Sequence, residues 1–163
     1  MSINFREGVA ADVVAIHALL TELATHDGVV MRGTVADLLR HGFGARPLFR
    51  TLLAVRGEEV LGVALFYPDF STLRGRPGAY VQDLYLTQAA RGLGLGRRLL
   101  AEVRAVALDW GGAYLTLTVD RGNASARAFY ARQGFEDRGD YELLILEGAA
   151  LEALEHRGDD TGV

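Results

Sequence analysis

The chain has 163 residues and a formal net charge of −4 at pH 7, and half of its residues are hydrophobic. It has no cysteine, which excludes a disulfide-stapled module, a cysteine-ligated metal site and a cysteine nucleophile. An isoelectric point near 5.5 argues against a general nucleic-acid binder, and the longest apolar runs are too short to span a membrane. We expect no membrane or nucleic-acid partner and, since residues 1–7 lack a signal-peptide core, a cytoplasmic location.

All 17 basic residues are arginine, because the sequence contains no lysine. A genomic bias toward arginine codons is the favoured explanation, and avoidance of a reactive amine is the alternative. In either case the absence of lysine excludes a catalytic lysine and acetylation of the protein's own lysine side chains.

The N-terminal part of the chain is predicted to form one strand and two helices. Residues 3–6 alternate between apolar and polar side chains, as a strand does. Asp12 is a candidate N-cap for a helix whose apolar positions, from Val13 to Leu23, follow helical spacing. Thr34 and Asp37 resemble a capping box for a second helix that ends near Gly42.

The remainder of the chain mixes strands and helices. Strands are expected at 51–55, 60–66, 80–86, 114–119 and 141–146, a loop at 68–78, and helices at 97–110, 125–133 and 147–156. The first two of these strands form a hairpin pattern, so the chain does not simply alternate strands and helices. We therefore predict a mixed α+β fold (α/β in the broad sense), as a single domain over residues 1–156 with a tail at 157–163.

A glycine-rich loop follows the strand at 80–86 and opens a long helix. It consists of Arg91, Gly92, Leu93, Gly94, Leu95, Gly96 and Arg97. Alternating glycines let the backbone approach a ligand, and the unpaired amides of a helix start bind anions. The loop is neither a Walker loop nor the usual dinucleotide fingerprint. It predicts a pyrophosphate-binding site, and an ordinary glycine-rich turn is the alternative.

Together with a downstream motif, this loop resembles the GNAT superfamily of N-acetyltransferases. The downstream motif comprises Asn123, Ser125, Phe129, Tyr130, Gly134 and Phe135, and the two motifs stand in the family's order and at its separation. The resemblance implies a mostly antiparallel central sheet flanked by helices, in which two parallel strands splay apart and hold acetyl-CoA. It also implies that the protein is a homodimer and needs no metal.

Upstream residues resemble the spermidine/spermine (diamine) acetyltransferase branch and its bacterial relatives. The similar segments are 22–24, 37–39 with 42–44, Pro47, 70–78 and 82–85, so that the resemblance covers residues 3–146. Two positions depart from this branch. Leu73 stands where a tryptophan is common, and Gln82 stands where a glutamate is usual. The change at Gln82 removes an acidic group that lies near the acceptor amine in that branch.

The resemblance assigns roles in binding acetyl-CoA to three parts of the chain. The backbone of Leu84, Tyr85 and Leu86 would hold the pantetheine arm, and an amide of Leu84 or Leu86 could polarise the thioester carbonyl. Residues 91–97 would cradle the pyrophosphate. Asn123 would bind the pantetheine arm, with helix capping as the alternative, and Ser125 lies in the same motif.

Catalytic and substrate-binding roles are expected for a few polar residues. Tyr130 would be the acid that protonates the leaving thiolate, although a buried tyrosine packed beside Phe129 is the alternative. Asp83 could attract a cationic amine or accept its proton, and Gln82 could orient that amine. Glu22, Asp27 and Asp69 are further acidic candidates, each also explained as surface charge. The four histidines show no metal-binding spacing.

These residues predict an acetyl-CoA-dependent N-acetyltransferase that acts on a small cationic amine by direct attack on the thioester. The expected partner is a polyamine, a diamine or a lysine-like amino acid. Two alternatives remain open from the sequence. One is a non-catalytic acyl-CoA-binding sensor or partner module, suggested by Gln82, and the other is a protein N-acetyltransferase.

Overall fold

The computed structural model describes residues 2–139 and 143–154. Its described part contains one sheet with the strand order β1-β2-β3-β4-β5. The strands are β1 (Asn4–Glu7), β2 (Arg50–Arg56), β3 (Glu59–Ser71), β4 (Arg76–Leu86) and β5 (Leu115–Thr116). The first four strands pair antiparallel, and β5 is parallel to β4. This mixed sheet confirms the predicted fold class.

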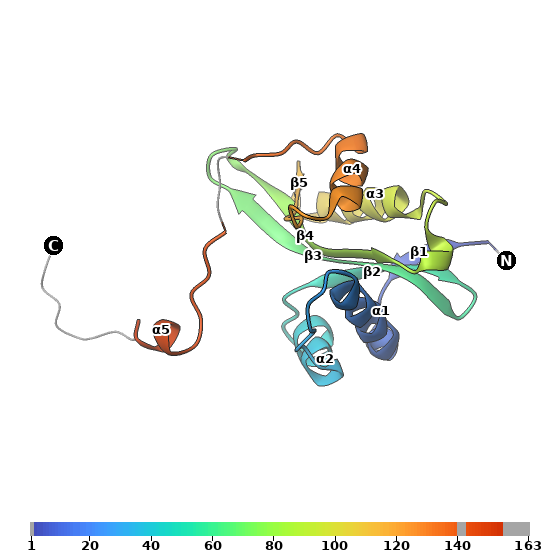
Figure 1. The fold of residues 1–163 in the computed structure, drawn as a ribbon, viewed down its shortest axis with the longest axis horizontal. Coiled ribbons are helices and arrows are strands. Elements are labelled where there is room, and N and C mark those ends of the chain that lie inside the picture. The colour runs from blue at the N-terminus through green and yellow to red at the C-terminus, as the bar shows by residue number, and fades with distance from the viewer. Residues whose placement is uncertain (1, 140–142, 155–163) are drawn as a thin grey trace, which may run out of the picture.

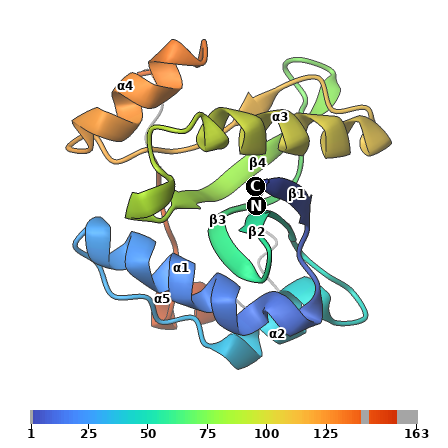
Figure 2. The same ribbon diagram turned by 90° about the vertical axis from the view of Figure 1, so that its right-hand side faces the viewer.

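Helices cover both faces of the sheet, as Figures 1 and 2 show. One face carries α1 (Val13–His26) and α2 (Val35–Phe43), and the other carries α3 (Leu95–Ala107) and α4 (Ala124–Arg132). Three short 3₁₀ turns, η1 (Ala10–Asp12), η2 (Gln88–Ala90) and η3 (Leu108–Trp110), adjoin these elements. The last helix, α5 (Ala149–Glu152), lies apart from the sheet (Figure 1). No helix in the described ranges is long and apolar enough to cross a membrane.

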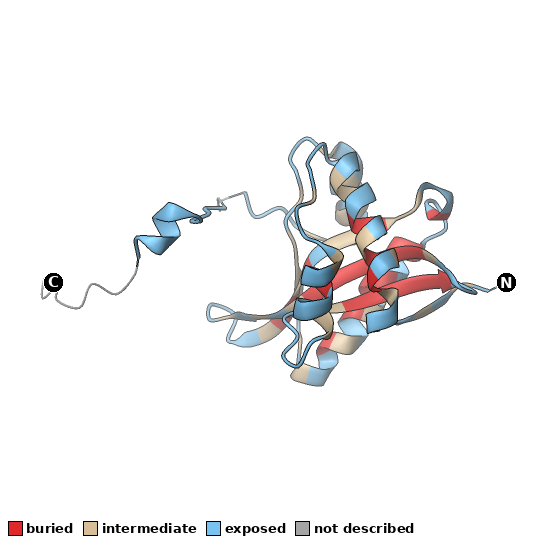
Figure 3. Cartoon of the chain, turned by 90° about the horizontal axis from the view of Figure 1, so that it is seen from below, coloured by how far each residue is buried: buried red, intermediate tan, exposed pale blue. Residues whose placement is uncertain are grey.

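The core lies in two layers on either side of the central strands. Successive side chains of a strand point to opposite faces, so Leu53 and Val63 pack toward α1, whereas Ala64 and Phe66 pack toward α3. Figure 3 shows the resulting buried strands between exposed helix surfaces. β4 contributes to both layers: Tyr85 packs on the side of α1 and α2, and Val81 packs on the side of α3 and α4.

The predicted loop at 68–78 is wrong, because most of it extends the hairpin. β3 runs to Ser71 and β4 begins at Arg76, which leaves a turn at 72–75. Pro68 lies opposite Ala79 in this hairpin. β2 pairs with β3 only as far as Phe66. Beyond that point no described strand lies on the other side of β3, so the amide hydrogen that Pro68 lacks is not needed for strand pairing there. The turn-forming residues therefore predicted a loop where β3 and β4 continue as a two-stranded antiparallel pair.

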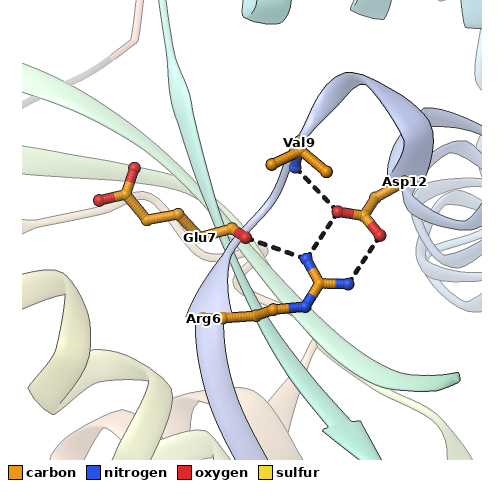
Figure 4. A network of polar contacts seen from close by, with 4 residues as sticks. All are labelled: Arg6, Glu7, Val9 and Asp12. Carbon is orange, nitrogen blue, oxygen red and sulfur yellow. Dashed lines mark hydrogen bonds and ion pairs between the residues drawn. The ribbon is translucent and has the colours of Figure 1, made fainter. Parts of the chain in front are cut away.

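The predicted cap of α1 is also wrong in detail. The Asp12 carboxylate accepts hydrogen bonds from the Val9 amide at 2.8 Å and from the Arg6 guanidinium at 2.7 and 2.8 Å (Figure 4). It makes no side-chain cap for α1 itself, so it stabilises the preceding 3₁₀ turn instead. The Arg6 hydrogen bond, followed by the Val9 amide, holds the pKa of Asp12 below its ordinary value. The Thr34 and Asp37 capping box of α2 is confirmed.

Other boundaries differ most toward the C-terminus. α3 begins at Leu95 rather than 97, and the strand expected at 114–119 is limited to β5. Residues 143–146 form no strand, and the rest of that predicted element, 141 and 142, lies outside the described residues. The last helix is shorter than predicted, and the expected tail at 157–163 also lies outside the described residues.

Candidate active site

Two parallel strands separate in the middle of the molecule. β4 and β5 pair only at Ala79 with Leu115 and at Tyr80 with Thr116. Beyond these pairs a cavity of about 570 Å³ opens, lined by residues 82–86 of β4, residues 118–120, the end of α1, the start of α3 and one side of α4. We call this cavity the strand cleft. It is the splayed strand pair that the sequence predicted.

A β-bulge in β4 lies at the mouth of the strand cleft. Val81 is opposite Phe66 and Asp83 is opposite Leu65, so Gln82 is the extra residue in the ladder. A one-residue insertion reverses the side-chain alternation. Val81 consequently packs toward α3, while Asp83 lies on the α1 side of the sheet. The bulge thus places Asp83 on the face of the sheet that α1 covers.

The glycine loop forms the floor of the strand cleft. Gly92 has a φ of +77° and Gly94 a φ of +74°, a conformation that favours glycine. No side chain caps α3, so the amides of its first turn are available to an anion in the cleft. A Cβ on Gly96 would lie 3.0 Å from the Phe129 ring, so glycine here allows α3 and α4 to approach closely.

The two arginines of the loop differ in their surroundings. The Arg91 Nε donates to the Leu86 carbonyl at 3.3 Å, and its guanidinium lies 5.6 Å from the centre of the Tyr85 ring. Arg97 is exposed on the first turn of α3. Both line the strand cleft, so two positive charges flank the unpaired amides.

Tyr130 enters the strand cleft from α4. Its ring packs edge-on against Phe129 at 5.2 Å and Phe135 at 5.5 Å between centroids. Burial, and then the charges of Asp83 and Asp27, raise its pKa to about 12. The hydroxyl therefore stays protonated at neutral pH and can donate a hydrogen bond. The predicted packing beside Phe129 is therefore present, Tyr130 also lines the strand cleft, and its role as an acid stays a prediction.

Asp83 lies where the strand cleft meets a second cavity. Burial, and then the charge of Asp27, raise the pKa of Asp83 from 3.8 to about 6. The carboxylate is therefore charged at neutral pH in a setting that disfavours its charge, and a cation placed beside it would be attracted. Next to it, the Gln82 Oε1 accepts a hydrogen bond from the Tyr67 hydroxyl at 3.3 Å, which orients the Gln82 amide.

Asn123 joins the two sides of the strand cleft. Its side-chain oxygen accepts from the Ala126 amide at 3.0 Å, so the predicted helix-capping role is confirmed. Its Nδ2 donates to Asp27 at 3.5 Å, which links the end of α1 to the start of α4. Ser125 also lines the cleft. A contact from either residue to a ligand stays a prediction.

Glu22 and Asp69 lie outside the lining of both cavities. Glu22 accepts a hydrogen bond from the Tyr85 hydroxyl at 3.0 Å, and Asp69 accepts one from the Tyr114 hydroxyl at 2.7 Å. Of the three additional acidic candidates, the structure brings only Asp27 together with Asp83. No group of three metal-binding side chains occurs among residues 2–139 and 143–154.

The second cavity, about 650 Å³, was not predicted. We call it the apolar groove; it lies between α1, α2 and the bulge of β4, and shares Leu23, Asp27, Gln82 and Asp83 with the strand cleft. The sequence analysis also missed His26 and residues 118–120 in the strand cleft. These residues come from segments far apart in the chain and form no local motif, so no spacing signal could identify them.

The splayed parallel pair, the glycine loop at a helix start and the tyrosine from the next helix agree with the resemblance to the N-acetyltransferases. The family model of the "Acetyltransferase (GNAT) family" matches residues 17–135. The chain therefore belongs to the GNAT acetyltransferase family, and it is an N-acetyltransferase.

Named relatives agree with this assignment. The chain is 30% identical to a thialysine N-epsilon-acetyltransferase of Bos taurus, over 93% of this chain and 96% of the relative. It is 35% identical to a spermidine/spermine N(1)-acetyltransferase-like protein of Homo sapiens, over 64% of this chain and 16% of the relative. An integron cassette protein from the mobile metagenome of V. cholerae shares the fold, with a TM-score of 0.78 and 23% identity, over 94% of this chain and 98% of that one.

Proposed function

We propose that the protein transfers an acetyl group from acetyl-CoA to the primary amine of a small cationic molecule. The observation that carries this proposal is the convergence of the glycine loop, Tyr130 and Asp83 on one cleft. Diamines, polyamines and lysine-like amino acids are the candidate acceptors. The names of the relatives, which include thialysine and spermidine/spermine, support a small amine rather than a protein.

The residues of the strand cleft fit acetyl-CoA. The pyrophosphate would be held by the amides at the start of α3, with Arg97 and Arg91 beside them. The pantetheine arm would run along residues 84–86, whose backbone groups on the β5 side have no strand partner because β5 has diverged. The Asn123 amide and Ser125 would complete this binding from α4.

Acetyl-CoA supplies an activated thioester, so the protein needs to position the reactants and manage protons. The amine nitrogen forms a bond to the acetyl carbon, the carbon–sulfur bond breaks, and the amine gives up two protons. A backbone amide of Leu84 or Leu86 would donate to the carbonyl oxygen as negative charge develops there. One proton goes to the thiolate and the other to water, which balances the reaction.

Tyr130 would act chiefly as a hydrogen-bond donor to the departing sulfur. With its pKa raised to about 12, full transfer of its proton to a thiolate is strongly uphill. The thiolate, near a reference pKa of about 8.5, would instead receive a proton that originates on the amine. The hydroxyl lowers the barrier by stabilising charge on sulfur and relays that proton.

Asp83 would attract the ammonium form of the acceptor. An amine with a pKa of about 10.4 is almost fully protonated at pH 7 and must lose a proton before it attacks. The Asp83 carboxylate, with its pKa near 6, is charged under these conditions and stands at the junction of the two cavities. Water at this junction would carry the proton away, and Gln82 would orient the amine without acting as a base.

The test is thiol release by the purified protein with acetyl-CoA and a panel of amines: putrescine, spermidine, thialysine, lysine and simple alkylamines. We expect amine-dependent release and a mass increase of one acetyl group on the product. Acetyl-CoA binding without turnover across the whole panel would favour the non-catalytic alternative, which Gln82 suggests. Preferential acetylation of peptides would favour a protein N-acetyltransferase.

We also propose that two copies of this single-domain chain associate. The support is an exposed apolar run, in which Leu143, Leu144, Ile145 and Leu146 are 73, 86, 71 and 50% exposed. Such a run marks an interaction surface. Light scattering should give twice the mass of one chain, and Leu144→Asp should lower that mass while Leu73→Asp, at an equally exposed leucine, should not. A single-chain mass for the unaltered protein would refute the association.

A further inference from the structure

The apolar groove is asymmetric in charge along its length. Among the residues that the structure describes, the charged ones that line it are Asp27 and Asp83, and both lie at the end shared with the strand cleft. The remaining walls come mainly from apolar side chains of α1, the segment after it, α2 and the segment before β2, among them Leu20, Met31, Leu38 and Phe49. One end of the groove therefore suits a cation, and the rest suits hydrocarbon.

The outer walls of the groove are apolar even where they meet solvent. Val29, Val30 and Leu48 are 62, 86 and 67% exposed, although exposed positions are usually polar. An apolar surface that is continuous with a catalytic cleft and left open at its outer end is typical of a ligand-binding groove. The volume of about 650 Å³ exceeds what an ammonium group needs, so the groove has room for the body of the acceptor.

A second cation on the acceptor would find no partner in these walls. Carrying an ammonium group out of water into apolar surroundings is costly unless it is paired. Asp27 and Asp83 are both at the reacting end, and no described residue lining the outer part of the groove is acidic. A diamine or polyamine would therefore have to leave its distal ammonium in solvent or bury it unpaired.

We propose that the acceptor is an amine with a single cationic group and an uncharged, apolar body that lies in the apolar groove. This inference rests on the proposed acetyl transfer to a small cationic amine, and it replaces the candidate acceptors that carry two or more cationic groups with amines that carry one. The reacting nitrogen would lie beside Asp83, and the alkyl or aryl body would contact Leu20, Leu38, Phe49 and Leu65.

The first test compares acceptors that differ at one end. Hexylamine and 1,5-diaminopentane have nearly the same shape, with a methyl group in the first where the second has an ammonium group. We expect hexylamine to have a kcat/KM at least about tenfold higher, because its distal end is buried without an unpaired charge. In the series from propylamine to hexylamine, kcat/KM should rise by about fourfold per methylene group, the factor that corresponds to burying one methylene.

The second test places a charge in the outer wall. Val30→Asp introduces a carboxylate into the groove at an exposed position, where the fold should tolerate it. It should raise kcat/KM for 1,5-diaminopentane and lower it for hexylamine, so that the preference shifts by about tenfold or more. Val14→Asp makes the same change at an exposed valine outside the groove and should leave the preference unchanged.

The outcomes separate the two proposals. If amines are acetylated but the diamine is preferred, or if kcat/KM does not depend on chain length, the acceptor class proposed here is wrong and the proposed function stands. A peptide amine preferred over hexylamine would refute it equally. If no amine of any class is acetylated, the proposed function itself fails.

Discussion

The strand cleft and the apolar groove meet at Asp83 but are built in different ways. The strand cleft presents backbone groups, from the glycine loop, the start of α3 and the unpaired edge of β4, with arginines beside them. The apolar groove presents side chains, most of them apolar, from α1, α2, β3, β4 and the segments that follow α1 and precede β2. A donor site made from backbone tolerates many side-chain changes, whereas an acceptor site made from side chains can change specificity through single substitutions.

The largest expected effect comes from Tyr130→Phe, which keeps the aromatic packing and removes the hydroxyl of the strand cleft. We expect kcat to fall by about 100-fold, because charge on the departing sulfur loses its donor, while KM for acetyl-CoA stays the same. Tyr114→Phe is the matched control, since the Tyr114 hydroxyl donates to Asp69 at 2.7 Å and neither residue lines the strand cleft. Normal turnover by Tyr130→Phe would remove this residue from the mechanism.

Asp83→Asn should affect the junction of the two cavities. We expect kcat/KM for the amine to fall by about 30-fold, because the ammonium form loses its carboxylate partner. In the unaltered protein, log kcat/KM should rise with slope 2 below pH 6, where both Asp83 and the amine must lose protons, and with slope 1 above it. The variant should show slope 1 throughout. Glu22→Gln, which alters an acidic residue outside the lining, should keep the break.

Gly94→Ala should affect the donor site alone. A side chain at a φ of +74° strains the loop by about 1 kcal/mol and displaces the amides at the start of α3, so KM for acetyl-CoA should rise by about tenfold. Gly75→Ala imposes similar strain, at a φ of +63°, in the distant hairpin turn. The two variants should have the same urea stability, and an equal rise in KM for both would contradict a specific role of the loop.

The last expected effect concerns the stability of the fold rather than activity. The raised pKa of Asp83 means that the folded protein carries a cost that is absent below pH 3.8, grows as the pH rises and is complete above about 6. Asp83→Asn removes this cost, so it should stabilise the protein at pH 7.5 by at most about 3 kcal/mol while it impairs activity. Urea unfolding should show a smaller stability gain for Asp83→Asn at pH 4 than at pH 7.5. An equal gain at the two pH values would refute the raised pKa of Asp83.

The sequence predicted what is built locally. The turn of the glycine loop, the helix that follows it and the capping by Asn123 each depend on residues close in the chain, and the structure contains all three, with α3 beginning at Leu95 rather than 97. The bulge at Gln82 could not be predicted, because it depends on the register between β3 and β4. The apolar groove was missed for the same reason, as Leu20 and Phe49 become neighbours of Asp83 only through the packing of α1 and α2 on the sheet.

The hairpin of β3 and β4 shows that turn-forming residues do not always predict a loop. Pro68 and Pro77 indicated a loop, yet both lie in strands where no third strand needs their missing amides. The run at 143–146 shows the opposite case. Its composition predicted a strand, but a strand requires a neighbour, and none of the described elements pairs with it.

Two residue pairs join β4 to β5 in the described part of the chain, so we expect this connection to be a weak point of the sheet. Past Thr116, no strand pairing among the described residues holds the segment that leads to α4, and the Tyr80 and Thr118 hydroxyls form a hydrogen bond between it and β4 at 2.9 Å. We expect a ligand in the cleft to add contacts between β4 and this segment. Acetyl-CoA should slow amide hydrogen exchange in α4 and at the open edge of β4 far more than in β2, which is paired on both sides.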